Sequence, residues 1–351
     1  NFAAWGKLLR RQAGERGQQR ASFPTSLLSY YTDNGAYYYY HNPVEGGYGV
    51  LLKDVQEYMK QIDVPVRAYQ IDSYWYYRGS TTNGLANWTA TPASFPLGLT
   101  HLQESLGMPI VAHSRYFAVD NVYANHAGYR FLSSDGKHSA PMDVRFWDDL
   151  FRNASSWVTT YEQDWVYRQQ TYVEQFMDTP GLARSWLLQL DAGAQLNGIS
   201  VQLCGHLLRH ALQAVEMPSV NHARASGDLN SNSNQWSLLD ESMILHGLGL
   251  RPFKDVFWTS TPQPGSPYVP PDDLTPLACP VREALSATLS TGPVAIGDGI
   301  GYTDRELVMR SVRSDGVVLS PSRPAATLDV TLPYRAGLVR HAPRPPPPLG
   351  A

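Results

Sequence analysis

Cysteine, charge and long apolar runs are all scarce in this sequence, and each scarcity argues against a class of protein. The 351 residues include two cysteines, Cys204 and Cys279, too few for a disulfide scaffold, and the sequence leaves open whether they pair. No Cys-x-x-Cys or Cys/His spacing typical of zinc occurs, so neither a metal nor another cofactor is expected. No apolar run reaches the ~18 residues of a membrane-spanning helix. Charged residues make up 17% of the chain and the net charge is −3, which argues against a nucleic-acid partner.

Aromatic residues, in contrast, are abundant. The chain contains 21 Tyr and 9 Trp, many of them at the ends of apolar runs. Such rings often fill a core, but their faces also stack on the C–H faces of sugars while the polar tips of Tyr and Trp hydrogen-bond hydroxyl groups. With 43% hydrophobic residues, the chain is long enough for one large domain or two smaller ones. The aromatic clusters therefore make a carbohydrate ligand one hypothesis beside simple core packing.

Short apolar runs alternate with helical patterns along most of the chain. The runs end in polar or aromatic residues, and residues 48–62 are an example of an intervening segment with apolar side chains at helical spacing. Strands that alternate with helices every ~30–50 residues predict βαβ units and a parallel sheet. The runs cover 26–40, 64–77, 108–118, 156–167, 198–206, 218–229, 244–260 and 290–301. Eight strands over about 275 residues favour a (β/α)8 TIM barrel, which takes ~250 residues, over a doubly wound open sheet.

The pattern changes on both sides of this α/β region. Residues 1–25 predict a helical lead-in, and residues 26–305 predict the barrel. Residues 306–340 lack a helical repeat and predict strands and turns, the start of a small C-terminal β-region. Residues 341–351 are rich in proline, which is typical of an extended tail.

Acidic side chains stand near the ends of the predicted strands. Barrel enzymes build their sites at the C-terminal ends of the strands. Glycoside hydrolysis needs two carboxyl groups there, one to attack or to activate water and one to donate a proton. Asp164 and Asp228 lie near the ends of the fourth and sixth runs, so both can face one pocket, although a single acid at such a position is also a common N-cap. The candidates are Asp33, Asp72, Asp120, Glu162, Asp164, Asp228, Asp255 and Asp298.

Four segments together resemble a known family. They are "YQIDSYWY" (69–76), "YEQDW" (161–165), "ARASGDL" (223–229) and "STGPVAIGDGIG" (290–301). In order and spacing they are similar to the motifs of strands two, four, six and eight in α-galactosidase (melibiase) and raffinose-synthase-like glycoside hydrolases. The ordered set, over roughly residues 25–305, is more specific than any single motif. The resemblance implies a (β/α)8 barrel that acts on an α-linked sugar with retention of configuration, an α-galactoside being the first expectation.

The resemblance also implies roles for individual residues. Asp164 would be the nucleophile of a double displacement, and Asp228 would be the general acid/base. Trp75 and Cys204 would line the sugar pocket, and His206 would either hydrogen-bond a hydroxyl group or serve a structural role. The residues expected to bind substrate are Asp33, Asp72, Trp75, Glu162, Cys204, His206 and Arg224.

Two positions depart from the family pattern. Glu162 stands where the relatives carry a Lys, two residues before the nucleophile. A like charge beside Asp164 is expected to raise the pKa of one of the two carboxyl groups. At the end of the second strand, Ser73 replaces the second member of an Asp pair.

Three functions stay open at this point. The chain fits a retaining glycosidase, a transglycosidase, or a non-catalytic barrel that binds carbohydrate or serves as a structural subunit of a larger assembly. The expected partner is an oligosaccharide or glycoconjugate, and the sequence identifies no assembly partner. Two N-x-S/T sequons, which begin at Asn87 and Asn153, favour a secretory, lumenal or extracellular location.

Overall fold

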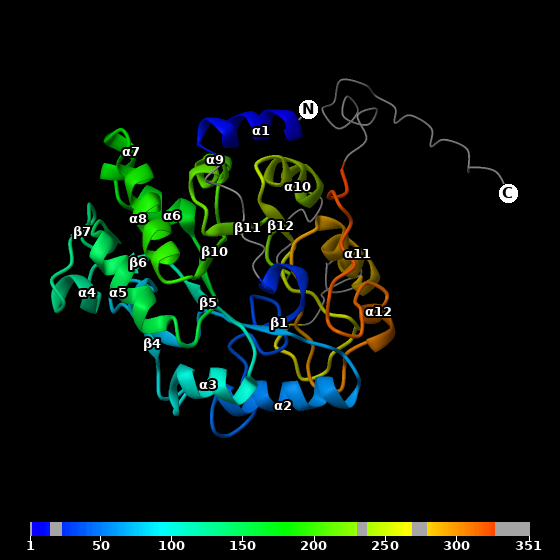
Figure 1. The fold of residues 1–351 in the computed structure, drawn as a ribbon. Helices are drawn as coiled ribbons and strands as arrows, with labels where there is room; N and C mark the ends of the chain where they lie inside the picture. Colours follow the sequence, from blue (N-terminus) through cyan, green and yellow to red (C-terminus); the bar gives the residue numbers. More distant parts are fainter. Residues whose placement is uncertain (1, 15–22, 230–236, 269–278, 327–351) are drawn as a thin grey trace.

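A barrel of eight parallel strands forms the centre of the protein (Figure 1). The computed structural model describes residues 2–14, 23–229, 237–268 and 279–326. The barrel strands are β1 (Leu28–Tyr31), β2 (Ala68–Ile71), β5 (Ile110–Ser114), β9 (Thr160–Gln163), β10 (Ser200–Leu203), β11 (Val220–Arg224), β12 (Arg251–Phe253) and β13 (Val294–Ile296). Each strand lies within one of the eight apolar runs, so the predicted (β/α)8 barrel is confirmed.

The barrel strands are neighbours in chain order, and the sheet closes on itself. β1 pairs with β2 on one side and with β13 on the other, where Leu28 lies opposite Val294. The gap between β12 and β13 is closed just beyond β12 by a parallel bridge from Phe257 to Ile296. There the Phe257 N–H donates to the Ala295 carbonyl at 3.2 Å, and the Gly297 N–H donates to the Phe257 carbonyl at 3.0 Å. Because all strands run in the same direction, their carboxyl ends open on one side of the barrel.

Helices cover the outside of the barrel. They are α2 (Tyr48–Gln61), α3 (Gly98–Leu106), α5 (Val144–Ala154), α8 (Leu182–Leu196), α9 (Leu208–Gln213), α10 (Ser237–Gly247) and α11 (Pro280–Ser290), with α6 (Val166–Tyr172), α7 (Gln175–Asp178) and the 3-10 turn η2 (Ala214–Glu216) beside them. On α2, Leu51, Val55 and Met59 recur on one face of the helix and are buried. Helices α5 and α8 pack so closely that a Cβ on Gly193 would lie 2.6 Å from Cβ of Trp147.

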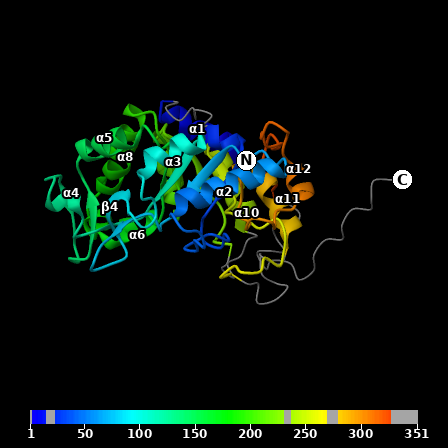
Figure 2. The same ribbon diagram turned by 90° about the horizontal axis from the view of Figure 1, so that it is seen from below.

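A second, smaller sheet lies at one side of the barrel, away from α11 and α12 (Figure 2). It contains β3 (Tyr76–Arg78), β4 (Leu85–Ala90), β6 (Phe117–Ala118), β7 (Phe131–Leu132) and β8 (His138–Pro141), with α4 (Val122–Asn125) beside it. Its strands come from the chain segments that follow β2 and β5. The sequence analysis did not anticipate this sheet. Its strands β3, β6 and β7 have only two or three residues, too few to show an alternating pattern.

The segments that flank the barrel agree with the sequence only in part. Helix α1 (Phe2–Gln12) occupies the predicted lead-in and packs on α10, where Arg10 donates to the Gly247 carbonyl at 2.5 Å; the 3-10 turn η1 (Phe23–Ser26) leads into β1. In the predicted β-region, residues up to Met309 form the helix α12 (Arg305–Met309), whose N-terminus is capped by the side chain of Asp304. Antiparallel bridges follow at 27–317 and 312–318. The proline-rich tail lies outside the described residues. None of the described helices is both long and apolar enough to cross a membrane.

The barrel interior holds a belt of polar side chains where many barrels have branched aliphatic ones. Glu162, on β9, is fully buried and lies opposite Gln202 of β10, which in turn lies opposite His222 of β11. The amides of Gln70 and Gln202 donate to the two carboxyl oxygens of Glu162 at 3.0 Å and 2.9 Å. A ring nitrogen of His222 bonds the side-chain oxygen Oε1 of Gln202 at 2.7 Å. These bonds satisfy polar groups whose burial would otherwise destabilise the fold.

Candidate active site

Most of the acids predicted at strand ends lie at the open end of the barrel. Asp72 follows β2 directly and Asp164 follows β9 directly. The other four stand two to four residues beyond β1, β11, β12 and β13: they are Asp33, Asp228, Asp255 and Asp298. Asp120 does not join them, because it follows β6 of the small sheet and accepts hydrogen bonds from the N–H and hydroxyl of Ser80.

Asp164 is fixed on one side of the open end by donors that stabilise its charge. His113, at the end of β5, lies 3.3 Å from Oδ2 of Asp164, and the Trp165 N–H donates to Oδ1 at 2.6 Å. Burial opposes ionisation, but the His113 bond, the charges of His113 and Arg224 and the Cys204 thiol hold the pKa of Asp164 well below its usual range. The carboxylate also lies against Gly205, where an added Cβ would be 2.9 Å from Oδ1. Asp164 is therefore a preformed anion.

Tyr76 and His113 form the support for this carboxylate. The Tyr76 hydroxyl bonds Nδ1 of His113 at 3.0 Å, and the two rings stack at 6.0 Å between centroids. Burial disfavours a charged imidazole, yet the charge of Asp72 and the bond to Asp164 raise the pKa of His113 above its usual value. The sequence analysis did not select His113. Its only signal was a histidine within an apolar run. Strand register places it opposite Glu162, two residues before Asp164, to which it bonds.

Arg224 is the centre of the other side of the open end. Its Nη2 donates to Oδ1 of Asp228 at 2.6 Å, while its Nη1 lies 3.5 Å from Oδ2 of Asp255 and 3.7 Å from Oδ2 of Asp33. The side-chain amide of Asn34 donates to Oδ2 of Asp228 at 2.8 Å. One cation thus faces three carboxyl groups, and these come from the ends of β1, β11 and β12.

Burial and mutual repulsion raise the pKa values of two of these carboxyl groups, Asp255 and Asp33. Burial raises the pKa of Asp255 to about 6, although Arg224 acts in the opposite direction. Burial and the charge of Asp255 likewise raise the pKa of Asp33 well above its usual range. Asp255, one of the candidate acids, directly follows Lys254 in the chain, so the two could have formed an ion pair. In the structure Lys254 instead pairs with Glu283 of α11 at 2.7 Å.

Asp72 and Ser73 lie between these two sides. Oδ1 of Asp72 accepts the Ser73 N–H at 2.5 Å, and Oδ2 accepts the Gln70 amide at 3.1 Å. The Ser73 hydroxyl is bonded at 3.0 Å to the hydroxyl of Tyr40, a residue of the tyrosine run that follows β1. Ser73, one of the two departures from the family that the sequence resembles, therefore links the first two strand ends.

Three expected substrate contacts need correction. Glu162 points into the barrel and lies in the polar belt, where it is 0% exposed. Trp75 is also 0% exposed and packs between Trp88 and Trp157, so it fills the layer outside the barrel instead of lining a pocket. His206 bonds the Arg224 carbonyl at 3.0 Å through Nε2, which favours its structural role.

The like charges of Glu162 and Asp164 were expected to raise the pKa of one of these two carboxyl groups, and the group with the raised pKa is Glu162. Burial is the largest cause, and together with the charge of Asp72 it raises the pKa of Glu162 to about 7, although His113 opposes the rise. The pKa of Asp164 is not raised, because the bond and charge of His113 and the charge of Arg224 outweigh the effect of burial.

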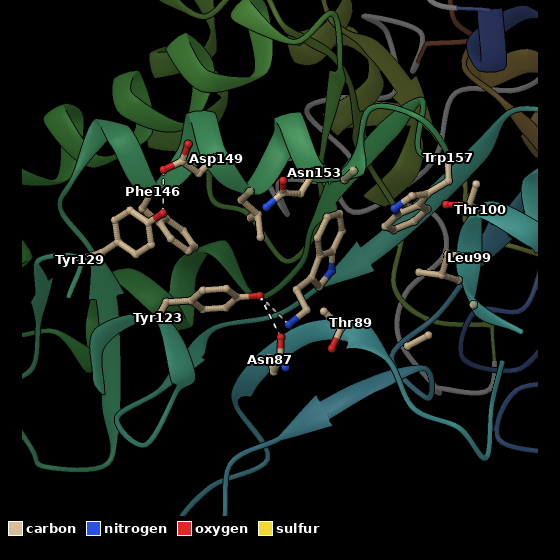
Figure 3. Close-up of a pocket in the computed structure, with 15 residues that line it drawn as sticks. Asn87, Thr89, Leu99, Thr100, Tyr123, Tyr129, Phe146, Asp149, Asn153 and Trp157 are labelled. Carbon is tan, nitrogen blue, oxygen red and sulfur yellow. Dashed lines mark hydrogen bonds between the residues drawn. The ribbon is translucent and has the colours of Figure 1, made fainter. Parts of the chain in front are cut away.

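A separate pocket of about 380 Å³ lies beside β4, α3 and α5 (Figure 3). None of the predicted site residues lines it. The Tyr123 hydroxyl accepts the Trp88 N–H at 2.8 Å and donates to Asn87 at 3.3 Å. Asn87 and Asn153, the first residues of the two sequons, both line this pocket, which no local sequence pattern indicates.

The fold and the open end of the barrel define a class, a (β/α)8 barrel with several acids at its strand ends. No protein-family model matches the chain, and no curated protein matches its sequence. Among solved structures, it is similar to α-galactosidase from Thermus thermophilus in complex with p-nitrophenyl α-D-galactopyranoside, with a TM-score of 0.55 and 15% identity over 87% of this chain and 64% of that one. The same enzyme in complex with stachyose gives a TM-score of 0.54 at 14% identity, covering 88% of this chain and 67% of that one.

The fold is also similar to that of α-galactosidase from Saccharomyces cerevisiae, with a TM-score of 0.51 and 12% identity over 86% of this chain and 66% of that one. The chain thus spans between 64% and 67% of the length of these enzymes. At such low identity the likeness shows a shared fold. The resemblance seen in the sequence is confirmed at that level.

Proposed function

We propose that the protein is a retaining glycosidase that cleaves an α-linked sugar, with an α-galactoside as the first substrate to try. Asp164 is the nucleophile and Asp228 is the general acid/base; Asp72, Asp33 and Arg224 bind sugar hydroxyl groups. The observation that carries the proposal is the contrast between two carboxyl groups at one end of the barrel. Asp164 is held as an anion by His113, and Asp228, two barrel strands away, is held by Arg224 and Asn34.

The reaction takes two steps. In the first, the Asp164 carboxylate attacks the anomeric carbon while Asp228 gives its proton to the leaving oxygen, and the C–O bond breaks to leave a glycosyl ester on Asp164. In the second, Asp228 takes a proton from water, the water oxygen attacks the anomeric carbon and Asp164 is released. Two inversions give net retention.

Arg224 lets Asp228 change its charge during this cycle. An arginine bonded to one carboxylate alone would oppose protonation of that group. Here Nη1 of Arg224 also faces the carboxyl groups of Asp33 and Asp255, so the guanidinium keeps other oxygen acceptors nearby when Asp228 is protonated. The pKa of Arg224 is raised well above its usual value, with burial opposing and the surrounding acids outweighing it, so the cation itself stays charged.

Hydrolysis of a panel of p-nitrophenyl α-glycosides tests the proposal, with the galactoside first. We expect turnover by the wild type and a loss of about 10⁴-fold in Asp164→Asn, the order seen when one member of a catalytic set is removed. Asp178→Asn, at an exposed acid on α7, is the matched control and should keep full activity. NMR of the first-formed sugar should show the α-anomer.

The outcomes separate the alternatives. No turnover of any glycoside by the folded wild type contradicts the enzyme and favours a non-catalytic barrel. A β-anomer as first product contradicts double displacement. Transfer of the sugar to an added acceptor, in preference to water, identifies a transglycosidase that uses the same two carboxyl groups.

A further inference from the structure

Three arginines gather beside Asp72 and Asp164 without carboxylate partners. Arg78 lies on β3, Arg115 directly follows β5, and Arg168 lies on α6. Among the residues that the structure describes, none of the three forms a salt bridge. Most of the arginines that do form salt bridges lie on the surface, where water screens their charge. These three, in contrast, are half-buried.

Aromatic rings and backbone carbonyls fix the guanidinium planes. The guanidinium groups of Arg115 and Arg168 lie over the indole of Trp165, the residue after Asp164, at 5.8 Å and 4.0 Å from its centroid. Arg78 lies over the ring of Tyr40 at 5.1 Å and donates to the Ser73 carbonyl at 2.9 Å. These contacts connect the cations to the strand ends that carry Asp72 and Asp164. Cation–π contacts hold an arginine in place without neutralising it.

The three arginines differ in what their N–H groups already bond. Arg168 donates to the hydroxyls of Tyr167 at 2.7 Å and Tyr172 at 3.1 Å, so ring and hydroxyl contacts account for its position. Arg115 donates from Nη1 to the Asn83 carbonyl at 2.9 Å, and its Nε is buried with no partner. Arg115 is therefore the one with donor capacity to spare.

Arg115 and Arg78 also repel each other. Burial lowers the pKa of Arg78, and the charge of Arg115 is the second cause. Burial lowers the pKa of Arg115, but the charges of Tyr76, Asp164 and Asp72 outweigh it and raise that pKa. Neither acid lies within salt-bridge distance of Arg115 or Arg78, so neither cation is neutralised by contact. Two half-buried cations held side by side cost free energy that a bound anion would recover. Planar guanidinium forks match the oxygens of a carboxylate or a sulfate ester.

We infer that the site takes an anionic sugar, whose carboxylate or sulfate group is bound by Arg115 with Arg78 beside it. The inference rests on the proposed function for the location of the sugar ring, next to Asp72 and Asp164, and it names the class of substrate. Arg168 serves as a stacking partner of Trp165 and makes no contact with the anion.

Binding of monosaccharides to the wild-type protein tests this directly, because free sugars are not hydrolysed further. Galactose, galacturonate and galactose 6-sulfate differ only at C6, and they are titrated calorimetrically at fixed ionic strength. A charge-assisted hydrogen bond predicts that at least one anionic sugar binds roughly tenfold or more tighter than galactose. The carboxylate and the sulfate arms distinguish a uronic acid from a sulfated sugar. Equal or tighter binding of galactose than of both anions overturns the inference.

Variants then assign the preference to the arginines. Arg115→Gln and Arg78→Gln should lose the preference for the anion while binding galactose as before, and Arg168→Gln, the matched control, should keep it. Arg115→Lys keeps the charge if Arg115→Gln fails to fold. A preference that survives in both Gln variants overturns the assignment.

Hydrolysis assays keep this inference separate from the proposed function. Turnover of neutral α-glycosides with no preference for anionic sugars in binding or turnover overturns the inference and supports the glycosidase. Arginine-dependent binding of an anionic sugar with no turnover of any glycoside supports the inference about binding and overturns the glycosidase.

Discussion

The two sides of the barrel's open end stabilise their carboxyl groups in opposite ways. On the side of β5 and β9, one carboxylate has several donors, and the pKa of Asp164 is low because His113, Arg224 and Cys204 overcome the effect of burial. On the side of β1, β11 and β12, one cation serves three carboxyl groups, and burial raises the pKa values of Asp33 and Asp255. A surplus of donors produces an anion, and a shortage of cations produces groups that hold protons near neutral pH.

Removal of Arg224 should have the largest effect on stability and on activity. In Arg224→Ala, Asp33, Asp228 and Asp255 lose their shared cation, and breaking a buried ion pair costs about 3–5 kcal/mol. We expect the free energy of unfolding at pH 7, measured with urea, to fall by that order, and glycosidase activity to be lost. The loss of stability should shrink at pH 5, because the carboxyl groups protonate. Arg224→Lys, which keeps the charge, should recover part of the stability; equal losses in both variants would contradict the argument.

Replacement of His113 should remove a hydrogen-bond donor from Asp164, on the side of β5 and β9. In His113→Asn the Asp164 carboxylate loses its main donor and a nearby positive charge, so its pKa rises. The acidic limb of the profile of kcat/KM against pH should therefore move to higher pH, with a loss of about 10- to 100-fold at pH 5 and a smaller loss at pH 7. An unchanged acidic limb would show that His113 does not control Asp164.

The pH dependence of stability tests the role of Glu162 in the polar belt, which lies beneath both sides of the open end. Its pKa in the folded protein is raised from 4.5 to about 7, so its contribution to stability is fully present below pH 4.5 and is lost as the pH rises through 7. Glu162→Gln abolishes this dependence. Between pH 4.5 and pH 7 the wild type should therefore lose up to about 3 kcal/mol of unfolding free energy relative to the variant. Urea unfolding at both pH values measures it, with Glu104→Gln, an exposed acid on α3, as the control. Parallel curves for wild type and Glu162→Gln would refute the assignment.

Two single hydrogen bonds should give the smallest effects. Asn34→Ala removes the amide bond to Asp228, and Tyr76→Phe removes the hydroxyl bond to His113. A net hydrogen bond of about 0.5–1.5 kcal/mol corresponds to a change of about 2- to 10-fold in kcat/KM. The acidic limb should move in Tyr76→Phe alone. A shift of the acidic limb in Asn34→Ala would mean that the two sides of the open end are not independent.

The sequence was informative wherever a pattern is local. The apolar runs were long enough to reveal all eight barrel strands. Orientation was out of reach, because Glu162 and Asp164 are only two residues apart and the end of β9 at Gln163 separates an inward side chain from one at the open end. Trp75 follows a turn after Asp72, and that turn directs its ring outward. His113 acquires a role through strand register, and register involves residues far apart in the chain.

The closure of the barrel has a consequence for how the chain folds. Strands β2, β5, β9, β10 and β11 pair with neighbours that are close in sequence, whereas β1 finds β13 only after nearly the whole barrel has been made. Pairings between distant segments must first bear the entropy of a long loop, so we expect the seam between β1 and β13 to form late and to open first in hydrogen exchange. His113 and Asp164 belong to the early part and Asp33 to the seam. A partly folded barrel would then hold a finished nucleophile long before Arg224 meets its full set of acids.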